Sequence, residues 1–189
     1  MLIGVDIDNV LAEFEAAFRQ WINLHAGLSL KRQNITSFWF ADCCPLSHGE
    51  VDNLLSGFID AGWLRRLSVI GHARAAMRAL SRQAEVCLVT SRPSRAPIVA
   101  DTLFWLERKG IPHSRLLWAE RKWELADTFS FFVEDNLDQA RGLADRGVNV
   151  LLLDYPWNRD PTPHPKIRRL CSWREVLPCL TGYALSPSP

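Results

Sequence analysis

The chain has 189 residues, of which 48% are hydrophobic and 23% are charged, and its formal net charge is +1. This length and apolar content suit a single globular domain with room for an insertion. A net charge near zero without a long basic run excludes an extended nucleic-acid-binding surface. No apolar run approaches the roughly 20 residues that a membrane-spanning helix requires.

The first residues and the absence of a long apolar run predict a cytoplasmic protein, and that compartment guides the interpretation of the cysteines. An acidic motif begins at Asp6, which leaves no room for a signal peptide. The cysteines at positions 43, 44, 87, 171 and 179 are odd in number and lack paired C-x-x-C spacing, which argues against a disulfide framework and a zinc site. We therefore expect reduced thiols.

Short aliphatic runs recur along the chain and alternate with helical patterns, which is typical of buried parallel strands joined by crossover helices. Four runs are clear, and they span 1–5, 84–90, 129–133 and 148–153. A fifth run, at 114–119, is weaker. The pattern predicts an α/β fold, a Rossmann-like three-layer sandwich around a five-stranded parallel sheet.

The segment after the first strand breaks this rhythm. Helical spacing is clear over 11–27, where Gly27 is the expected helix stop, and again over 48–64. A connection between strand and helix normally has a few residues, so we interpret 12–70 as an inserted helical unit. Residues 1–11 and 71–183 would then form the core. The insertion should lie over the carboxyl ends of the strands, where α/β sheets bind ligands.

The C-terminal part carries weaker signals. The proline-rich stretch 154–166 reads as an irregular loop, 172–180 as a last helix, and 184–189 as a flexible tail.

Polar side chains follow four of the predicted strands at the edge where parallel strands bring their carboxyl ends together. The set consists of Asp6 and Asp8, then Thr90, Ser91 and Arg92, then Lys122, and finally Glu134 and Asp135. Arg121 is a rival for Lys122, and Asp138 is a rival for Asp135. Several carboxylates in one crevice repel each other unless a cation lies among them, and hard oxygen ligands favour Mg²⁺.

The spacing of the first two aspartates suggests a division of labour. Asp6, ionised beside the metal, could attack phosphorus. Asp8, if its neighbours keep it protonated, could protonate the leaving oxygen and later take a proton from water. Thr90 and the amides beside it, together with Lys122, could hold phosphate oxygens.

The four motifs "DIDNV" at 6–10, "VTSRP" at 89–93, Lys122 and "VEDN" at 133–136 resemble, in order and spacing, those of haloacid dehalogenase (HAD) superfamily phosphohydrolases. The resemblance implies that Asp6 is the nucleophile and Asp8 the general acid and base. It also implies that Mg²⁺ is held by Asp6, the backbone carbonyl of Asp8, and Asp135. Thr90 and Lys122 would bind phosphate, with Ser91 and Arg92 as further candidates.

Within that superfamily, "DIDNVLAEFE" at 6–15 is similar to the first motif of the 5'(3')-deoxyribonucleotidases, which carry a helical C1-type cap. The aromatic "SFWF" at 37–40 resembles part of that cap, and "DYPWN" at 154–158 resembles a late segment of bacterial relatives. The likeness implies a base pocket that includes Phe14, Phe38 and Trp39, although such aromatic residues also occur in ordinary cores.

The sequence departs from the family pattern at two positions. Asn9 replaces the usual Gly, and Asn tolerates unusual turn dihedrals better than most residues. Glu134 replaces the usual Asp. Its direct contact with the metal is therefore left open, and it is a candidate to support the metal ligands from behind.

These observations predict a Mg²⁺-dependent phosphomonoester hydrolase that works through an aspartyl-phosphate on nucleoside monophosphates. The expected protein is a monomer or a homodimer that binds neither a nucleic-acid polymer nor a membrane. One alternative is a phosphatase for another small phosphorylated metabolite. Another is a phospho-accepting or binding domain without hydrolysis, which the second aspartate of the D-x-D pair disfavours.

Overall fold

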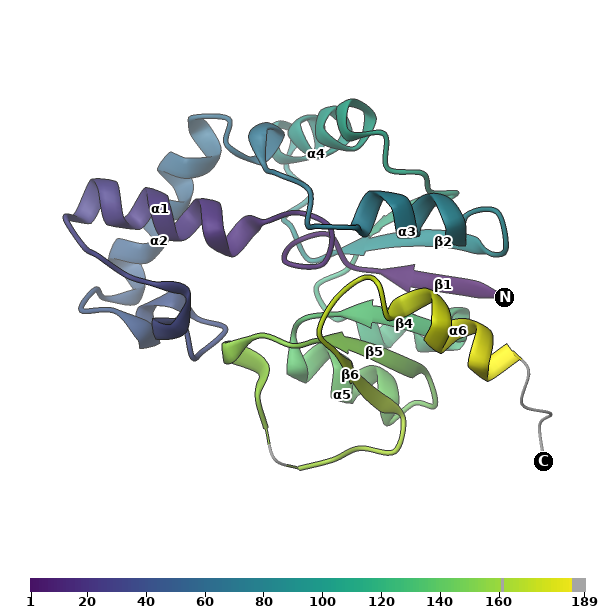
Figure 1. Cartoon of the computed structure of the whole chain (residues 1–189). Helices are drawn as coiled ribbons and strands as arrows, with labels where there is room; N and C mark the ends of the chain where they lie inside the picture. Colours follow the sequence, from purple (N-terminus) through teal and green to yellow (C-terminus); the bar gives the residue numbers. More distant parts are fainter. Residues whose placement is uncertain (161, 185–189) are drawn as a thin grey trace.

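The computed structural model describes residues 1–160 and 162–184, and its centre is a parallel β-sheet (Figure 1). The six strands lie in the order β3-β2-β1-β4-β5-β6, and every neighbouring pair is parallel. Their bounds are β1 Leu2–Val5, β2 Glu85–Thr90, β3 Arg115–Trp118, β4 Phe131–Glu134, β5 Asn149–Leu153 and β6 Ile167–Leu170. The carboxyl ends of all six strands therefore meet at one edge.

The predicted parallel α/β sheet is confirmed, but the prediction of five strands is wrong. The sixth strand, β6, pairs in parallel with β5 at the edge of the sheet. Its four residues read Ile-Arg-Arg-Leu, and the two arginines are exposed. A short edge strand with charged residues carries none of the continuous apolar pattern that marks a buried parallel strand.

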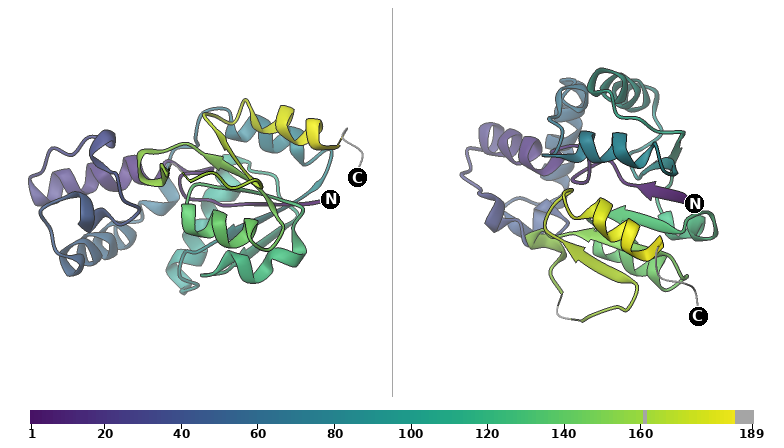
Figure 2. Two further views of the ribbon diagram at one scale, coloured as in Figure 1. Left: turned by 90° about the horizontal axis from the view of Figure 1, so that it is seen from below. Right: turned by 45° about the vertical axis from the view of Figure 1, so that its right-hand side comes forward.

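Helices cover both faces of the sheet, which gives three layers (Figure 2). One face of β1 and β2 packs on α3 (Ala73–Leu80), α4 (Ala96–Lys109) and α6 (Val176–Ala184). The other face packs on α5 (Leu137–Ala144) and on the 3₁₀ helix Lys122–Thr128. In β2, Val86 and Leu88 join the first cluster while Cys87 and Val89 join the second, because side chains alternate along a strand.

The middle of β1 depends on a glycine. A Cβ atom at Gly4 would lie 2.3 Å from the ring of Phe132 in β4. Only a residue without a side chain lets that ring fill the space beside β1, so Gly4 sets how β4 packs next to the strand that carries Asp6.

Residues between β1 and β2 hold a helical insertion whose main helices are α1 (Phe14–Ala26) and α2 (His48–Asp60). Helix α1 ends at Gly27, which adopts φ 66° as a left-handed cap and confirms the predicted stop. Helix α2 begins with a capping box between Ser47 and Glu50. Short 3₁₀ helices complete the insertion at Arg32–Asn34, Phe40–Cys43 and Leu64–Arg66.

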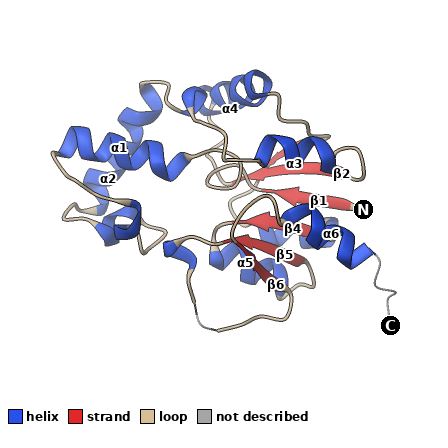
Figure 3. Cartoon of the chain, viewed as in Figure 1, coloured by secondary structure: helices blue, strands red, loops and turns tan. Residues whose placement is uncertain are grey.

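The insertion lies beyond the carboxyl ends of the strands, on the side to which the arrows point (Figure 3). Its two main helices meet through aromatic rings. Phe18 and Phe58 lie 5.4 Å apart in an edge-to-face contact, and both side chains are buried. Such pairs stabilise a helix interface beyond their buried area.

The C-terminal part differs in detail from the expectation. The described residues of 154–166 are largely irregular but include the 3₁₀ turn Pro156–Asn158. The last helix spans Val176–Ala184 rather than 172–180. The predicted tail falls mainly on residues 185–189, which lie outside the described residues. No helix in the described part of the chain is long and apolar enough to cross a membrane.

Candidate active site

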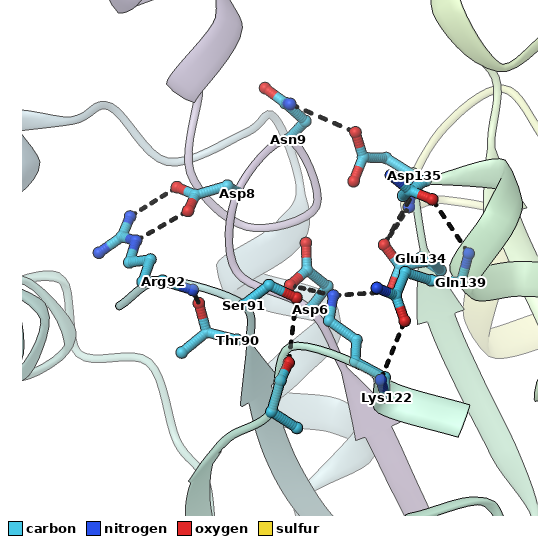
Figure 4. A network of polar contacts seen from close by, with 12 residues as sticks. Asp6, Asp8, Asn9, Thr90, Ser91, Arg92, Lys122, Glu134, Asp135 and Gln139 are labelled. Atoms are coloured by element: carbon cyan, nitrogen blue, oxygen red, sulfur yellow. Dashed lines mark hydrogen bonds and ion pairs between the residues drawn. The ribbon is translucent and has the colours of Figure 1, made fainter. Parts of the chain in front are cut away.

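Asp6 follows β1 directly and lies in a buried cluster of charged side chains (Figure 4). Its amide donates to the carbonyl oxygen of Val133 over 3.0 Å, which extends the pairing of β1 with β4. Asp6, Glu134 and Asp135 each place a carboxylate oxygen within 4.8 Å of the others. The structure thus brings together side chains that are more than a hundred residues apart in sequence, at the edge of the sheet where they were expected to meet.

Lys122 is the cation of this cluster. It begins the 3₁₀ helix after β3, is 2% exposed, and places Nζ 2.5 Å from Asp6 Oδ1 and 2.8 Å from Glu134 Oε2. Its amide donates to Oε1 of Gln139, which fixes the start of the helix. The rival Arg121 is exposed and lies 3.6 Å from Glu124, so the structure brings Lys122 and not Arg121 to the carboxylates.

The close approach of these buried charged groups changes their pKa values. The pKa of Asp6 is raised to about 7, chiefly by burial; Lys122 opposes the rise, and the charges of Glu134 and Asp8 add to it. Burial, with Glu134 and Asp6, raises the pKa of Asp135 well above its ordinary value. For Lys122, burial lowers the pKa, but the carboxylates of Asp6 and Glu134 outweigh it and raise the pKa above the usual range. Three carboxylates thus share one ammonium group, which leaves unbalanced negative charge.

Glu134 is fully buried and its oxygens already have partners. Oε2 faces Lys122, while Oε1 accepts hydrogen bonds from the amides of Asp135 and Asn136, over 3.2 Å and 3.1 Å. Glu134 therefore holds Lys122 and the turn after β4. In this structure it is a support for the cluster, and Asp135 offers the more available carboxylate.

Asp135 is held from two sides. Oδ2 accepts hydrogen bonds from Nδ2 of Asn9 over 3.2 Å and from the indole Nε1 of Trp157 over 3.0 Å. Asn9 adopts φ 59°, a left-handed conformation that Asn tolerates, and its Oδ1 accepts from the amide of Glu15. The replacement of Gly by Asn thus keeps the turn and adds a bond to Asp135. The rival Asp138 lies in the first turn of α5 and is not among the clustered carboxylates in the described structure.

Asp8 points away from the acidic cluster and binds Arg92 (Figure 4). Nε of Arg92 donates to Oδ2 and Nη2 donates to Oδ1, over 2.8 Å and 2.6 Å. Nη1 donates to the hydroxyl of Thr102 in α4. Both oxygens of Asp8 accept hydrogen bonds from Arg92, so the guanidinium fixes the orientation of this carboxylate.

Thr90 is the last residue of β2, which pairs with β1 in the sheet, and Ser91 follows it. Thr90 is 1% exposed and its hydroxyl oxygen accepts from the amide of Arg92 over 3.2 Å. Ser91 is exposed and donates to the carbonyl of Ala119 over 3.1 Å. Both residues therefore lie at the same edge of the sheet as Asp6, as expected for groups that could hold a phosphate.

The three predicted base-pocket residues are spread over the insertion. Phe14 packs on Phe18 and Phe58, at 5.6 Å and 5.8 Å between ring centroids, and belongs to the aromatic interior of the insertion. Phe38 and Trp39 are 44% and 64% exposed and contact each other edge to face. Among the described residues, no hydrogen bond or ring contact links Phe38 or Trp39 to the acidic cluster.

Sequence reasoning assigned no role to Trp157, Asn158 or Gln139, which the structure places around the cluster. Nδ2 of Asn158 donates to the backbone carbonyl of Asp135 over 2.7 Å. For Trp157 and Asn158 the available signal was the position of "DYPWN" immediately after a predicted strand, because it places both residues at the same edge of the sheet.

Comparison with known proteins points to one family. The family model described as "5' nucleotidase, deoxy (Pyrimidine), cytosolic type C protein" matches residues 1–181. The chain is 24% identical to the 5'(3')-deoxyribonucleotidase of Bacillus subtilis over 186 residues, 93% of this chain and 95% of that protein. It is 35% identical to a nucleotidase of Clostridium acetobutylicum over 101 residues, 51% of each chain.

Solved structures share the fold. A haloacid dehalogenase-like family hydrolase from Streptococcus pneumoniae superposes with a TM-score of 0.69 at 14% identity, over 95% of this chain and 97% of that one. The HAD-hydrolase YfnB from Bacillus subtilis, solved with bound magnesium, superposes with a TM-score of 0.63 at 14% identity, over 95% and 98%. The architecture is therefore that of HAD-like hydrolases.

Proposed function

Since the chain belongs to the family "5' nucleotidase, deoxy (Pyrimidine), cytosolic type C protein", whose members are nucleotidases of the HAD superfamily, we propose that the protein hydrolyses nucleoside monophosphates. The reaction would depend on Mg²⁺ and pass through an aspartyl-phosphate on Asp6. The chain is a phosphatase of the 5'-nucleotidase kind. The observation that carries the finer proposal is the buried cluster of Asp6, Glu134 and Asp135 around the single ammonium group of Lys122.

The residues fit a divalent cation. Three buried carboxylates and one ammonium leave unbalanced negative charge, which is reflected in the raised pKa values of Asp6 and Asp135. Hard oxygen ligands without His or Cys favour Mg²⁺. Asp6, Asp135 and the backbone carbonyl of Asp8 would hold the ion, and Glu134 would support them through Lys122. A bound Mg²⁺ would neutralise phosphate oxygens and keep Asp6 ionised at neutral pH.

The chemistry then follows from the chain's own side chains. A carboxylate oxygen of Asp6 forms a bond to phosphorus while the bond from phosphorus to the ester oxygen breaks. Asp8 gives its proton to that leaving oxygen, which departs as the nucleoside hydroxyl. Asp8 then takes a proton from water, whose oxygen attacks phosphorus and releases inorganic phosphate from Asp6. Lys122, Thr90 and Ser91 would bind the phosphate oxygens.

Arg92 was expected to bind phosphate as well. The observed contacts support a different role, because its Nε, Nη1 and Nη2 already serve Asp8 and Thr102. We assign Arg92 to the orientation of Asp8.

The helical insertion at 12–70 would act as the cap over this site, on the core formed by 1–11 and 71–183. The exposed rings of Phe38 and Trp39 support a stacking surface for a nucleobase, with Phe14 behind them in the aromatic interior. Deoxyribonucleotides are the favoured substrates, because the Bacillus subtilis relative is named a 5'(3')-deoxyribonucleotidase. The proposal includes a cytoplasmic enzyme that works as a monomer or a homodimer.

The test is phosphate release from ribonucleoside and deoxyribonucleoside monophosphates and from sugar phosphates, with Mg²⁺ or with EDTA. We expect Mg²⁺-dependent turnover that is strongest on deoxyribonucleotides and is lost in Asp6→Asn. Turnover on sugar phosphates alone would support the proposed phosphatase chemistry and reject nucleotides as the substrates. A phosphorylated Asp6 without phosphate release would favour the phospho-accepting alternative.

A further inference from the structure

The turn after β5 reaches back to the acidic cluster. The strand ends at Leu153, and the 3₁₀ turn Pro156–Asn158 follows. Within it the indole Nε1 of Trp157 donates to Asp135 Oδ2 over 3.0 Å. Asn158, 1% exposed, donates from Nδ2 to the carbonyl oxygens of Asp135 and Leu153, both over 2.7 Å. The turn therefore holds Asp135 by both its side chain and its backbone.

Strand β6 fixes this turn from the far side. Nη1 of Arg169 donates to Asn158 Oδ1 over 2.6 Å and to Asp154 Oδ1 over 3.0 Å. Nη2 of Arg169 donates to the carbonyl oxygen of Asn158 over 2.8 Å. Strand β6 therefore holds the turn through Arg169, and the turn holds Asp135 through Trp157 and Asn158.

The two side-chain donors to Asp135 use the same oxygen. Asn9 Nδ2 and Trp157 Nε1 both donate to Oδ2, whereas Oδ1 accepts none of the hydrogen bonds found among the described residues. Two neutral donors can orient a carboxylate without offering a charge that would repel a cation. Oδ1 is the oxygen left available for a metal ion.

We propose that Trp157 is a positioning residue that orients Asp135 toward the divalent cation through its indole N–H. The inference rests on the proposed function, because it takes Asp135 as a ligand of the cation. Partners of this kind around metal ligands typically change metal affinity or activity by roughly 10- to 100-fold when they are removed.

The ring of Trp157 has a second contact that a substitution can preserve. It stacks on Tyr155 with ring centroids 4.3 Å apart and planes within 6°. Trp157→Phe keeps an aromatic ring for this stack, but it removes the N–H donor and one of the two fused rings. A Trp→Phe change at another half-buried, stacked tryptophan therefore separates the effect of the hydrogen bond from the effect of ring size.

The experiment measures Mg²⁺ binding to the whole chain by calorimetry, the Mg²⁺ dependence of turnover, and melting in EDTA. Trp157→Phe should weaken Mg²⁺ binding roughly tenfold or more, with kcat largely restored at saturating Mg²⁺ and with unchanged melting in EDTA. The matched control is Trp63→Phe, since Trp63 is also half-buried and stacks on Phe58 at 5.7 Å. This control should bind Mg²⁺ as wild type does.

Equal Mg²⁺ affinity in wild type and Trp157→Phe would overturn the inference and leave the proposed function intact. Absence of Mg²⁺ binding in wild type would instead reject the cation site itself. If Trp157→Phe does not melt cooperatively in EDTA, the inference is tested with Arg169→Met instead. This variant releases the turn from β6 and keeps the Trp157 side chain. Unchanged Mg²⁺ affinity in a folded Arg169→Met would also overturn the inference, and a weaker affinity would support it.

Discussion

The guanidinium of Arg92 binds both carboxylate oxygens of Asp8, over 2.8 Å and 2.6 Å, in a pair that is largely buried. A bidentate pair of this kind fixes the orientation of a carboxylate as well as its charge. The hydroxyl of Thr102 accepts a hydrogen bond from Nη1 of Arg92 and donates one to the carbonyl oxygen of Ile98. Helix α4 thus helps to set the position of Asp8, the proposed general acid.

Replacement of Arg92 by Met should impair the step that depends on Asp8. We expect kcat/KM for a deoxyribonucleoside monophosphate to fall at least about tenfold, because an unoriented acid loses part of the 10²- to 10⁴-fold that such groups supply. For p-nitrophenyl phosphate, whose leaving group needs no proton, the loss should be much smaller. Equal losses on both substrates would indicate that Arg92 binds phosphate instead.

Removal of Lys122 should destabilise the protein. Lys122→Met leaves the buried carboxylates of Asp6, Glu134 and Asp135 without their ammonium group, and breaking a buried pair costs about 3–5 kcal/mol. Denaturant unfolding in EDTA measures this loss. The double variant Lys122→Met with Glu134→Gln should recover part of it, because one unpaired carboxylate becomes neutral. A single variant as stable as wild type would contradict the assignment of Lys122 as the balancing cation.

The raised pKa of Asp6 predicts a pH dependence of stability in EDTA. The pKa of Asp6 is about 7 in the folded chain and its ordinary value is 3.8, so between these values the folded protein holds a proton that the unfolded chain has released. Stability should therefore fall as pH rises through this window. Mg²⁺ competes with that proton, so the Mg²⁺-induced rise in Tm should be larger at about pH 8 than at about pH 5. In Asp6→Asn this difference should shrink, and a rise in Tm that is independent of pH in wild type would contradict the account.

Trp39 should affect substrate binding and leave the chemistry intact. Its side chain is 64% exposed on the insertion, and base stacking on an aromatic ring is worth about 1–3 kcal/mol. Trp39→Ala should raise KM for nucleoside monophosphates roughly 5- to 150-fold and leave KM for p-nitrophenyl phosphate unchanged. Leu24→Ala, at a residue that is 78% exposed on α1, is the control. An unchanged KM for nucleotides would remove Trp39 from the base pocket.

The parallel sheet and the meeting of Asp6 with Asp135 could be predicted from the sequence because both follow from local patterns. Apolar runs mark buried strands, and parallel strands bring their carboxyl ends to one edge. Gly27 marked the end of α1 for an equally local reason, the left-handed cap.

The features that were missed depend on contacts across the fold. Strand β6 carries two exposed arginines, and a pattern of hydrophobic residues cannot show that Arg169 donates a hydrogen bond to Asn158. The pairing of Arg92 with Asp8 joins residues 84 positions apart, so it needs the geometry of β1, β2 and α4 together. In the same way, the bond from Trp157 to Asp135 depends on a turn that Arg169 of the edge strand helps to hold in place.

The central claim is that Asp6 becomes phosphorylated during turnover. The most direct measurement is rapid acid quenching of the enzyme with a deoxyribonucleoside monophosphate that carries radiolabelled phosphate, followed by mapping of the labelled residue. The account predicts a label on Asp6 that requires Mg²⁺, is removed by hydroxylamine, and is absent from Asp6→Asn. Phosphate release without any label on Asp6, or full turnover by Asp6→Asn, would contradict it.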